Sequence, residues 1–150
     1  MKVTKKVREM IQYLCLNDHE PKFSPGPLQE QWLQSLESGD YKQTTDVLCK
    51  QKSDESDTPK FCCLGVACWL TKGVYWTPYP HKGMGYWCAN HKECSLPYEV
   101  LHNFKFFQHE GHIRETDKSL SALNDDHKFT FKEIATFVRL VPDLIFTESA

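Results

Sequence analysis

The longest stretch of the sequence without a charged side chain runs from Phe61 to Thr71. Apolar residues occur at successive positions of this stretch rather than in a stripe, which predicts an element with no face open to water. Its length exceeds the four to eight residues of a typical buried strand, and a lysine and Gly73 follow it as they follow many helices. We therefore expect a buried helix over residues 61–72 at the centre of the fold.

Apolar residues recur at helical spacing in three further segments, which predicts three more helices. The expected helices span residues 3–16, 28–38 and 131–141. Pro27 opens the second helix, because the first position of a helix tolerates the missing N–H group. The third begins with a capping box, in which the side chains of Thr130 and Glu133 each accept a hydrogen bond from the other's backbone amide.

Aromatic residues dominate two segments, 74–79 and 84–87, that are joined by a turn. They predict a β-hairpin in which Pro78 requires an edge position, because proline cannot donate to a neighbouring strand. The expected fold class is α+β: a single compact, mostly helical domain with a small aromatic β-hairpin packed on the central buried helix. The whole of residues 1–150 forms this domain, with a core at about 28–141 and a mobile acidic loop at 51–59.

The charge and the apolar content of the chain argue against several classes of protein. A net charge of −2 gives no electrostatic attraction for generic nucleic-acid binding. The apolar stretch is too short to span a membrane, and charges interrupt the apolar runs near the N-terminus, so neither a membrane protein nor a signal peptide is expected. We expect a cytoplasmic protein whose 7 cysteines are reduced.

A set of residues along the expected core carries a resemblance. These residues are Trp32, Leu36, Tyr41 and Gln43, the run Phe61-Cys62-Cys63-Leu64-Gly65-Val66, and Leu123-Asn124-Asp125 with Phe131 and Ile134. In them, over roughly residues 28–140, the chain resembles a group of small proteins encoded by tailed bacteriophages and prophages. That group has no established activity, so the resemblance implies no catalytic residue. It implies a viral protein in the cytoplasm of a bacterial host, where small accessory proteins are often inhibitors or decoys of host systems.

A first candidate site is a zinc site. Cys88, His91 and Cys94 follow one another at intervals of two intervening residues, and thiolates and imidazoles are the ligands that zinc prefers. Zinc takes four ligands, and His81 is the proposed fourth, with Cys62 or Cys63 as substitutes. In the alternative, Cys88 packs behind its neighbouring tryptophan and the other residues lie in a solvated loop.

A second candidate is a cysteine hydrolase. Cys62 or Cys63 would be the nucleophile, because a helix N-terminus lowers the pKa of a thiol. His91 is the proposed catalytic partner, and His81 and His127 are also available. The competing interpretation is that both cysteines pack in the core as small apolar residues.

The third candidate, a binding surface, is the one we favour. Its predicted residues are Tyr75, Trp76, Tyr79, Lys82, Tyr86 and Trp87. Aromatic rings anchor protein interfaces, and together with cations they also bind nucleotides, so the expected partner is a host protein or a small nucleotide. The rings could instead simply cover the central helix. The sequence thus favours a non-enzymatic protein that inhibits or sequesters a host factor, including an anti-defence role. No cofactor is expected, zinc stays an alternative, and the oligomeric state is open.

Overall fold

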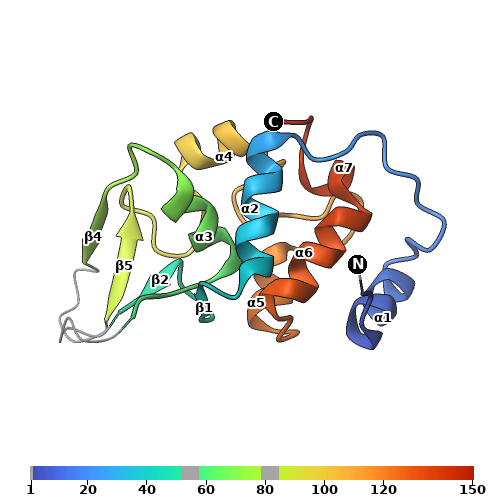
Figure 1. Cartoon of the computed structure of the whole chain (residues 1–150), viewed down its shortest axis with the longest axis horizontal. Coiled ribbons are helices and arrows are strands. Elements are labelled where there is room, and N and C mark those ends of the chain that lie inside the picture. The colour runs from blue at the N-terminus through green and yellow to red at the C-terminus, as the bar shows by residue number, and fades with distance from the viewer. Residues whose placement is uncertain (1, 52–57, 79–84) are drawn as a thin grey trace.

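In the computed structural model, which describes residues 2–51, 58–78 and 85–150, seven helices and five strands follow one another along the chain. The helices are α1 (Lys5–Tyr13), α2 (Pro27–Ser38), α3 (Cys63–Leu70), α4 (Tyr98–Phe104), α5 (Leu120–Asp125), α6 (Phe131–Leu140) and α7 (Pro142–Ile145). The strands are β1 (Lys42–Gln43), β2 (Cys49–Lys50), β3 (Lys60–Phe61), β4 (Trp76–Pro78) and β5 (Tyr86–Ala89). The hairpin of β4 and β5 lies at one end of the molecule and α1 lies at the other (Figure 1).

The five described strands form one mixed sheet in the order β1-β3-β2-β5-β4. Strands β1 and β3 run parallel, and every other neighbouring pair is antiparallel. Strands β4 and β5 form the predicted aromatic hairpin, and β4 takes the edge position that Pro78 requires. The hairpin is not separate, because β5 also pairs with β2 and so joins the rest of the sheet.

The expected fold class, a mostly helical domain with a small aromatic hairpin, is wrong. Helices account for 41% of the described residues and extended backbone for 13%, and the hairpin is only one side of a five-stranded sheet. Strands β2 and β3 escape recognition in the sequence because each is 2 residues long. An apolar and polar alternation needs roughly four residues or more before it identifies a strand.

Helix α3 forms within the apolar stretch but is shorter than the helix expected over 61–72. It begins after Cys62, whose sulfur caps the first turn, and it ends at Leu70. Residues 63–68 are all buried, whereas Trp69 is 51% exposed. The expectation that this helix has no face open to water is therefore wrong at its C-terminal end.

The backbone of α3 packs directly against the chain that leads into β2. A Cβ atom on Gly65 would lie 1.9 Å from the carbonyl oxygen of Leu48, far inside contact distance. The same carbonyl accepts a hydrogen bond of 3.3 Å from the amide of Cys62. Gly65 therefore allows this close approach, at the expense of some helix propensity.

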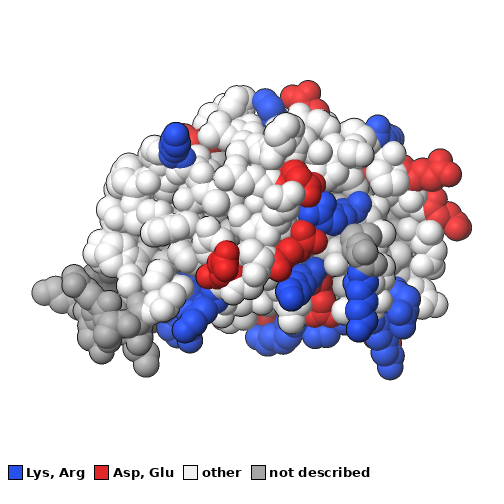
Figure 2. All heavy atoms as spheres, in the orientation of Figure 1, with Lys and Arg blue, Asp and Glu red and all other residues white. Residues whose placement is uncertain are grey.

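Helices α2 and α6 lie side by side in the middle of the molecule (Figure 1). Arg139 of α6 reaches two carboxylates of α2, with distances of 2.7 Å to Glu30 and 2.7 Å to Glu37. Acidic and basic side chains accordingly lie together where these helices meet on the surface (Figure 2). The hydrogen bond from Arg139 lowers the pKa of Glu30, which keeps the carboxylate charged and paired.

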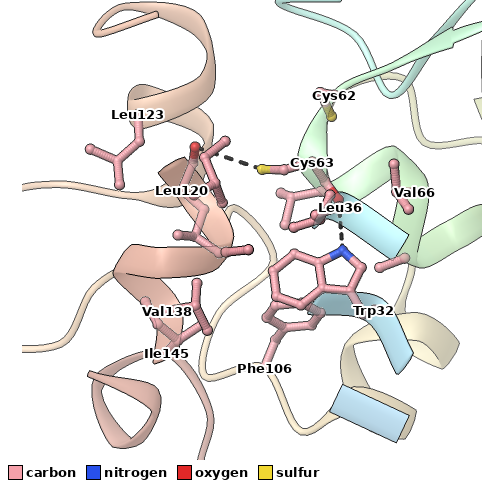
Figure 3. Close-up of a cluster of buried hydrophobic side chains, with 14 of the residues drawn as sticks. Trp32, Leu36, Cys62, Cys63, Val66, Phe106, Leu120, Leu123, Val138 and Ile145 are labelled. Carbon is pink, nitrogen blue, oxygen red and sulfur yellow. Dashed lines mark hydrogen bonds between the residues drawn. The ribbon is translucent and has the colours of Figure 1, made fainter. Parts of the chain in front are cut away.

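Trp32 joins α2 to α3 and to the C-terminal part of the chain (Figure 3). Its ring is fully buried, and its Nε1 donates a hydrogen bond of 2.9 Å to the carbonyl of Cys63. Its ring meets those of Phe106 and Phe146 edge-on, at centroid distances of 5.2 and 6.1 Å. One side chain thus supplies apolar area, aromatic contacts and a satisfied polar group to the core.

Gln43 of β1 and Asn124 of α5 form a polar network that we call the Gln43–Asn124 hub. The Asn124 Oδ1 accepts hydrogen bonds of 2.8 Å from Gln43 Nε2 and 3.2 Å from the amide of Cys63. The Asn124 Nδ2 donates to the carbonyl of Thr44 at 2.9 Å and to the carboxylate of Asp125 at 2.8 Å. Every donor and acceptor position of the Asn124 amide is therefore used, and the hub fixes the positions of β1, α3 and α5 relative to one another.

The N-terminus of α6 is held by the hub, by its own cap and by the segment before α1. Gln43 Oε1 accepts a hydrogen bond of 3.2 Å from the amide of Phe131. The predicted capping box is present, with bonds of 3.0 and 3.1 Å between Thr130 and Glu133. Burial disfavours the charged form of Glu133, but hydrogen bonds from Thr4 and Thr130 outweigh it and lower its pKa. This carboxylate therefore ties the N-terminal segment to the domain.

The predicted N-terminal helix over 3–16 is present as α1, over a shorter range. The expected mobile acidic loop at 51–59 falls largely on residues 52–57, which lie outside the described part of the chain. None of the described helices has the length and apolar character that a membrane span requires.

Candidate binding pocket

The strand register places several apolar side chains on one face of the sheet. Cys49 lies directly opposite both Phe61 and Trp87, and Trp76 lies in register with the residue two positions beyond Trp87. Directly paired residues and residues two positions apart on a strand project to the same face. Trp69 at the end of α3 joins this face, because its ring centroid is 5.3 Å from that of Phe61 and 6.2 Å from that of Trp76.

Except for Phe61, these side chains border a pocket of about 220 Å³ that we call the tryptophan pocket. Its lining residues are Cys49, Gln51, Pro59, Trp69, Trp76 and Trp87. Trp69 is 51% exposed, and Trp76 and Trp87 are half-buried. Large aromatic surface held open to water in this way favours a partner that covers it, because burial of apolar area is favourable.

The described residues that line the tryptophan pocket are uncharged. Burial raises the pKa of the Cys49 thiol to about 12, so this group is neutral at physiological pH. Of the other lining residues that the structure describes, only Gln51 has a polar side chain outside the tryptophans. The visible surface over α3, β4 and β5 also carries few charged side chains (Figure 2). The pocket therefore suits an apolar group.

The part of the chain that forms the pocket matches a known protein family. A family described as a domain of unknown function, DUF8296, matches residues 26–141. The chain belongs to this family. No curated protein and no solved structure matches the chain. The DUF8296 range contains every described lining residue of the tryptophan pocket and both residues of the Gln43–Asn124 hub, whereas α1 lies before it.

The sheet of this DUF8296 domain separates the predicted binding residues. Trp76 and Trp87 line the tryptophan pocket together. Tyr86 is next to Trp87 in β5 and therefore projects to the opposite face, where Lys50 Nζ lies 5.9 Å from the centroid of its ring.

The other predicted binding residues lie elsewhere. Tyr75 is 52% exposed, and its hydroxyl forms a hydrogen bond with Nε2 of His91. His91 follows Asn90 in a tight turn beyond β5, where both residues have positive φ angles of 68° and 46°. Tyr79 and Lys82 lie outside the described residues. Two of the six predicted residues thus meet in one described site.

Sequence reasoning missed Trp69, which contributes the most exposed ring of the tryptophan pocket. The unbroken apolar run grouped it with the buried residues of the central helix. A signal was present, because Trp69 stands close to Lys72 and Gly73, where the run ends. Cys49, Gln51 and Pro59 carried no such signal, since they reach the pocket only through the pairing of β2 with β5 and the position of β3.

The described residues of the predicted zinc site do not form a closed ligand set. Cys88 is buried, His91 bonds to Tyr75, and Cys94 is exposed. Across residues 2–51, 58–78 and 85–150, no group of three or more His, Cys, Asp and Glu side chains is positioned to hold a metal ion. The proposed fourth ligand, His81, lies outside these ranges.

The two proposed nucleophiles, Cys62 and Cys63, belong to the core. The Cys62 sulfur accepts a hydrogen bond from the amide of Gly65, and the Cys63 thiol points away from it, toward the carbonyl of Leu120 at 3.9 Å (Figure 3). Burial raises the pKa of Cys62 to about 12 and that of Cys63 well above its usual value. A nucleophilic cysteine needs a lowered pKa, so the environment of these thiols acts against the hydrolase alternative.

Proposed function

We propose that this chain is a non-enzymatic binding protein of phage type that inhibits or sequesters a protein of its bacterial host. The observation that carries the proposal is the tryptophan pocket, whose described lining residues are uncharged and in which Trp69 is 51% exposed. Tryptophan is among the residues that contribute most to protein interfaces when a partner buries them. The resemblance to proteins of tailed phages supplies the context: action in the host cytoplasm, including the blocking of an anti-phage defence.

The size of the pocket supports a protein partner. A volume of about 220 Å³ is smaller than the roughly 300–1,000 Å³ of pockets that enclose small-molecule ligands. It suits one large side chain of a partner, such as an aromatic or a leucine. Such an anchor in a preformed pocket, surrounded by less critical contacts, is the usual organisation of a protein interface.

The chemistry of the pocket also supports a protein rather than a nucleotide. Recognition of phosphate requires cations or clusters of N–H donors. None of the described lining residues is a lysine, arginine or histidine. Lys50 is the nearest lysine along the chain to the lining residue Cys49, but it lies with Tyr86 on the opposite face of the sheet. An apolar anchor of a host protein is therefore the partner that we propose for this site.

The test is the capture of a host protein by tagged wild-type chain and by variants of the pocket. We expect the wild type to retain one host protein, identified by mass spectrometry, and Trp69→Ala and Trp76→Ala to lose it. Because Trp69 is half open to water, its removal should lower the melting temperature only slightly. Binding of the purified partner to each variant, measured by calorimetry, then gives the loss of affinity directly.

Tyr98→Ala is the matched control, because Tyr98 is an aromatic residue of α4 that is 70% exposed and does not line the pocket. It should bind the partner as the wild type does. Undiminished binding by both tryptophan variants would exclude the pocket as the contact site. The proposed partner class would be contradicted if the wild type retained a nucleotide instead of a protein and the two tryptophan variants did not retain it.

A further inference from the structure

A second and larger pocket lies at the other end of the molecule, where α1 packs near the connection between α5 and α6. It has a volume of about 390 Å³, and we call it the α1 pocket. Its lining includes Lys6, Met10, Tyr13, Lys118, His127 and Phe129. Since α1 precedes the matched range 26–141, this pocket combines the DUF8296 domain with an added N-terminal helix.

The α1 pocket offers a flat ring above an apolar base. Met10 and Phe129 are 8% and 1% exposed and supply buried apolar surface. Tyr13, the last residue of α1, is 63% exposed, so its ring is open to a ligand. Aromatic rings in such positions stack on nucleobases, because every base has a planar π-face.

Two lysines lie near the aromatic rings of the α1 pocket, one at each ring. The Nζ of Lys118 lies 5.8 Å from the centroid of the Tyr13 ring, and the Nζ of Lys6 lies 5.9 Å from that of Phe129. Lys6 donates one hydrogen bond of 3.0 Å to the carbonyl of Lys128 and keeps its other donors. Within the described part of the chain, the Nζ of Lys118 and the ring of His127 make no hydrogen bond or ion pair.

Two carboxylates near the α1 pocket have partners within the chain. Glu9 is the only acidic lining residue in the described chain, and its carboxylate is 3.7 Å from the Nζ of Lys5. The carboxylate of Glu133, which interacts with Lys6, is held by hydrogen bonds from Thr4 and Thr130. The pocket therefore retains free positive charge, and basic side chains gather on the surface around α1 (Figure 2).

We propose that the α1 pocket binds a free mononucleotide. The base stacks on Tyr13, and the phosphate lies among Lys6, Lys118 and His127. The pocket volume falls in the range of roughly 300–1,000 Å³ that small-molecule sites occupy, unlike the tryptophan pocket. A net charge of −2 and three basic side chains favour a single phosphate over the repeated charge of a nucleic acid. This site is separate from the proposed contact with a host protein.

The experiment is a calorimetric titration of the full chain with adenosine monophosphate and guanosine monophosphate. Adenosine and inorganic phosphate serve as partial ligands. We expect saturable binding of at least one nucleotide, and affinities about tenfold weaker for the partial ligands. Tyr13→Ala and Lys118→Ala should each weaken nucleotide binding about tenfold, since each removes one of the two recognition elements.

Two variants are matched controls that leave the α1 pocket intact. Lys72→Ala removes the same charge and Tyr98→Ala removes an exposed ring, and both should bind nucleotide as the wild type does. Melting curves check folding, and Lys118→Gln keeps the side-chain length if the alanine variant is unstable. Three results would overturn the proposal: no saturation by either nucleotide, equal weakening by Lys72→Ala, or affinity for a single-stranded oligonucleotide that rises with its length.

Discussion

The Gln43–Asn124 hub and the tryptophan pocket lie in the same family-matched range, yet they differ in how their surfaces are satisfied. In the hub, every hydrogen-bonding position of the Asn124 amide has a partner within the chain. In the pocket, half of the Trp69 surface is open to water. A satisfied buried network stabilises one arrangement of the chain, whereas open apolar surface gains free energy only when something else covers it.

This difference separates the residues that mark the family resemblance from those that we propose for binding. Gln43, Asn124, Gly65 and Trp32 carried the resemblance to phage proteins, and each is explained by a contact inside the fold. A specific sequence motif can thus report how a domain folds and say little about what it binds. If the separation is real, substitutions in the folding region should lower stability, and substitutions in the binding region should leave it nearly unchanged.

The largest expected effect on stability is for Trp32, and it is measured against Trp69, which lies in different surroundings. Trp32→Ala should lower the free energy of unfolding by about 4 kcal/mol, because the ring is fully buried and its Nε1 is hydrogen-bonded. Trp69→Ala should cost only about 1 kcal/mol, because half of its surface is already in water. Urea denaturation followed by circular dichroism measures both. Equal costs would show that Trp69 is a core residue and would remove the distinction.

A second effect, of about 3 kcal/mol, is expected from Gly65→Ala. The new Cβ would lie 1.9 Å from the carbonyl oxygen of Leu48, so α3 must move away from the chain that leads into β2. Gly73→Ala is the control: Gly73 has a φ of 88°, but a Cβ there would meet no atom of the other described residues within 4 Å, its chain neighbours apart. Its cost of about 1 kcal/mol reflects backbone strain alone. Thermal melting of both variants gives the difference, and a Gly65 variant no less stable than the Gly73 variant would disprove the close approach.

Removal of the hub amide in Asn124→Ala should cost about 2 kcal/mol. The substitution leaves the buried amide of Cys63 and the carbonyl of Thr44 without their partner. Asn103→Ala, on the exposed side of α4, should change stability by no more than about 0.5 kcal/mol. Hydrogen exchange adds a local test, since the Cys63 amide should lose protection in the first variant and keep it in the second. Unchanged protection would mean that the hub is not what holds α3 to α5.

Local signals allowed helices such as α2 and α6 to be predicted, whereas features that depend on long-range pairing were not. The capping box of Thr130 and Glu133 and the position of Pro27 act within one turn of chain, so α6 and α2 were expected close to where they lie. The hub joins Gln43 to a residue 81 positions away, and a local sequence pattern cannot predict a hydrogen bond over that separation. The same holds for β2 and β3, whose two-residue strands exist only because the fold brings them together.

The candidate site was predictable in its composition but not in its geometry. Trp76 and Trp87 were expected from the aromatic segment, but the register of β4 against β5, together with the period of a strand, is what places both on one face. That period also assigned Tyr86 to the opposite face, but only once β5 and its register were known. Trp69 required knowledge of how α3 packs, because an unbroken apolar run does not show which of its positions faces water.

The smallest expected effect is on the chemistry of Cys62 and Cys63, which belong to the folding region in this comparison. Burial raises the pKa of both thiols, so at neutral pH each stays protonated, and a protonated thiol is a poor nucleophile. Iodoacetamide should therefore modify the exposed Cys15 and Cys94 of the native protein first and leave Cys62 and Cys63 unmodified until the chain unfolds. Peptide mass spectrometry at successive times measures the order, and the same reaction in denaturant is the control in which all four cysteines should react. Rapid modification of Cys62 or Cys63 in the native protein would instead favour the hydrolase, because it would require an open path and a thiolate at the start of α3.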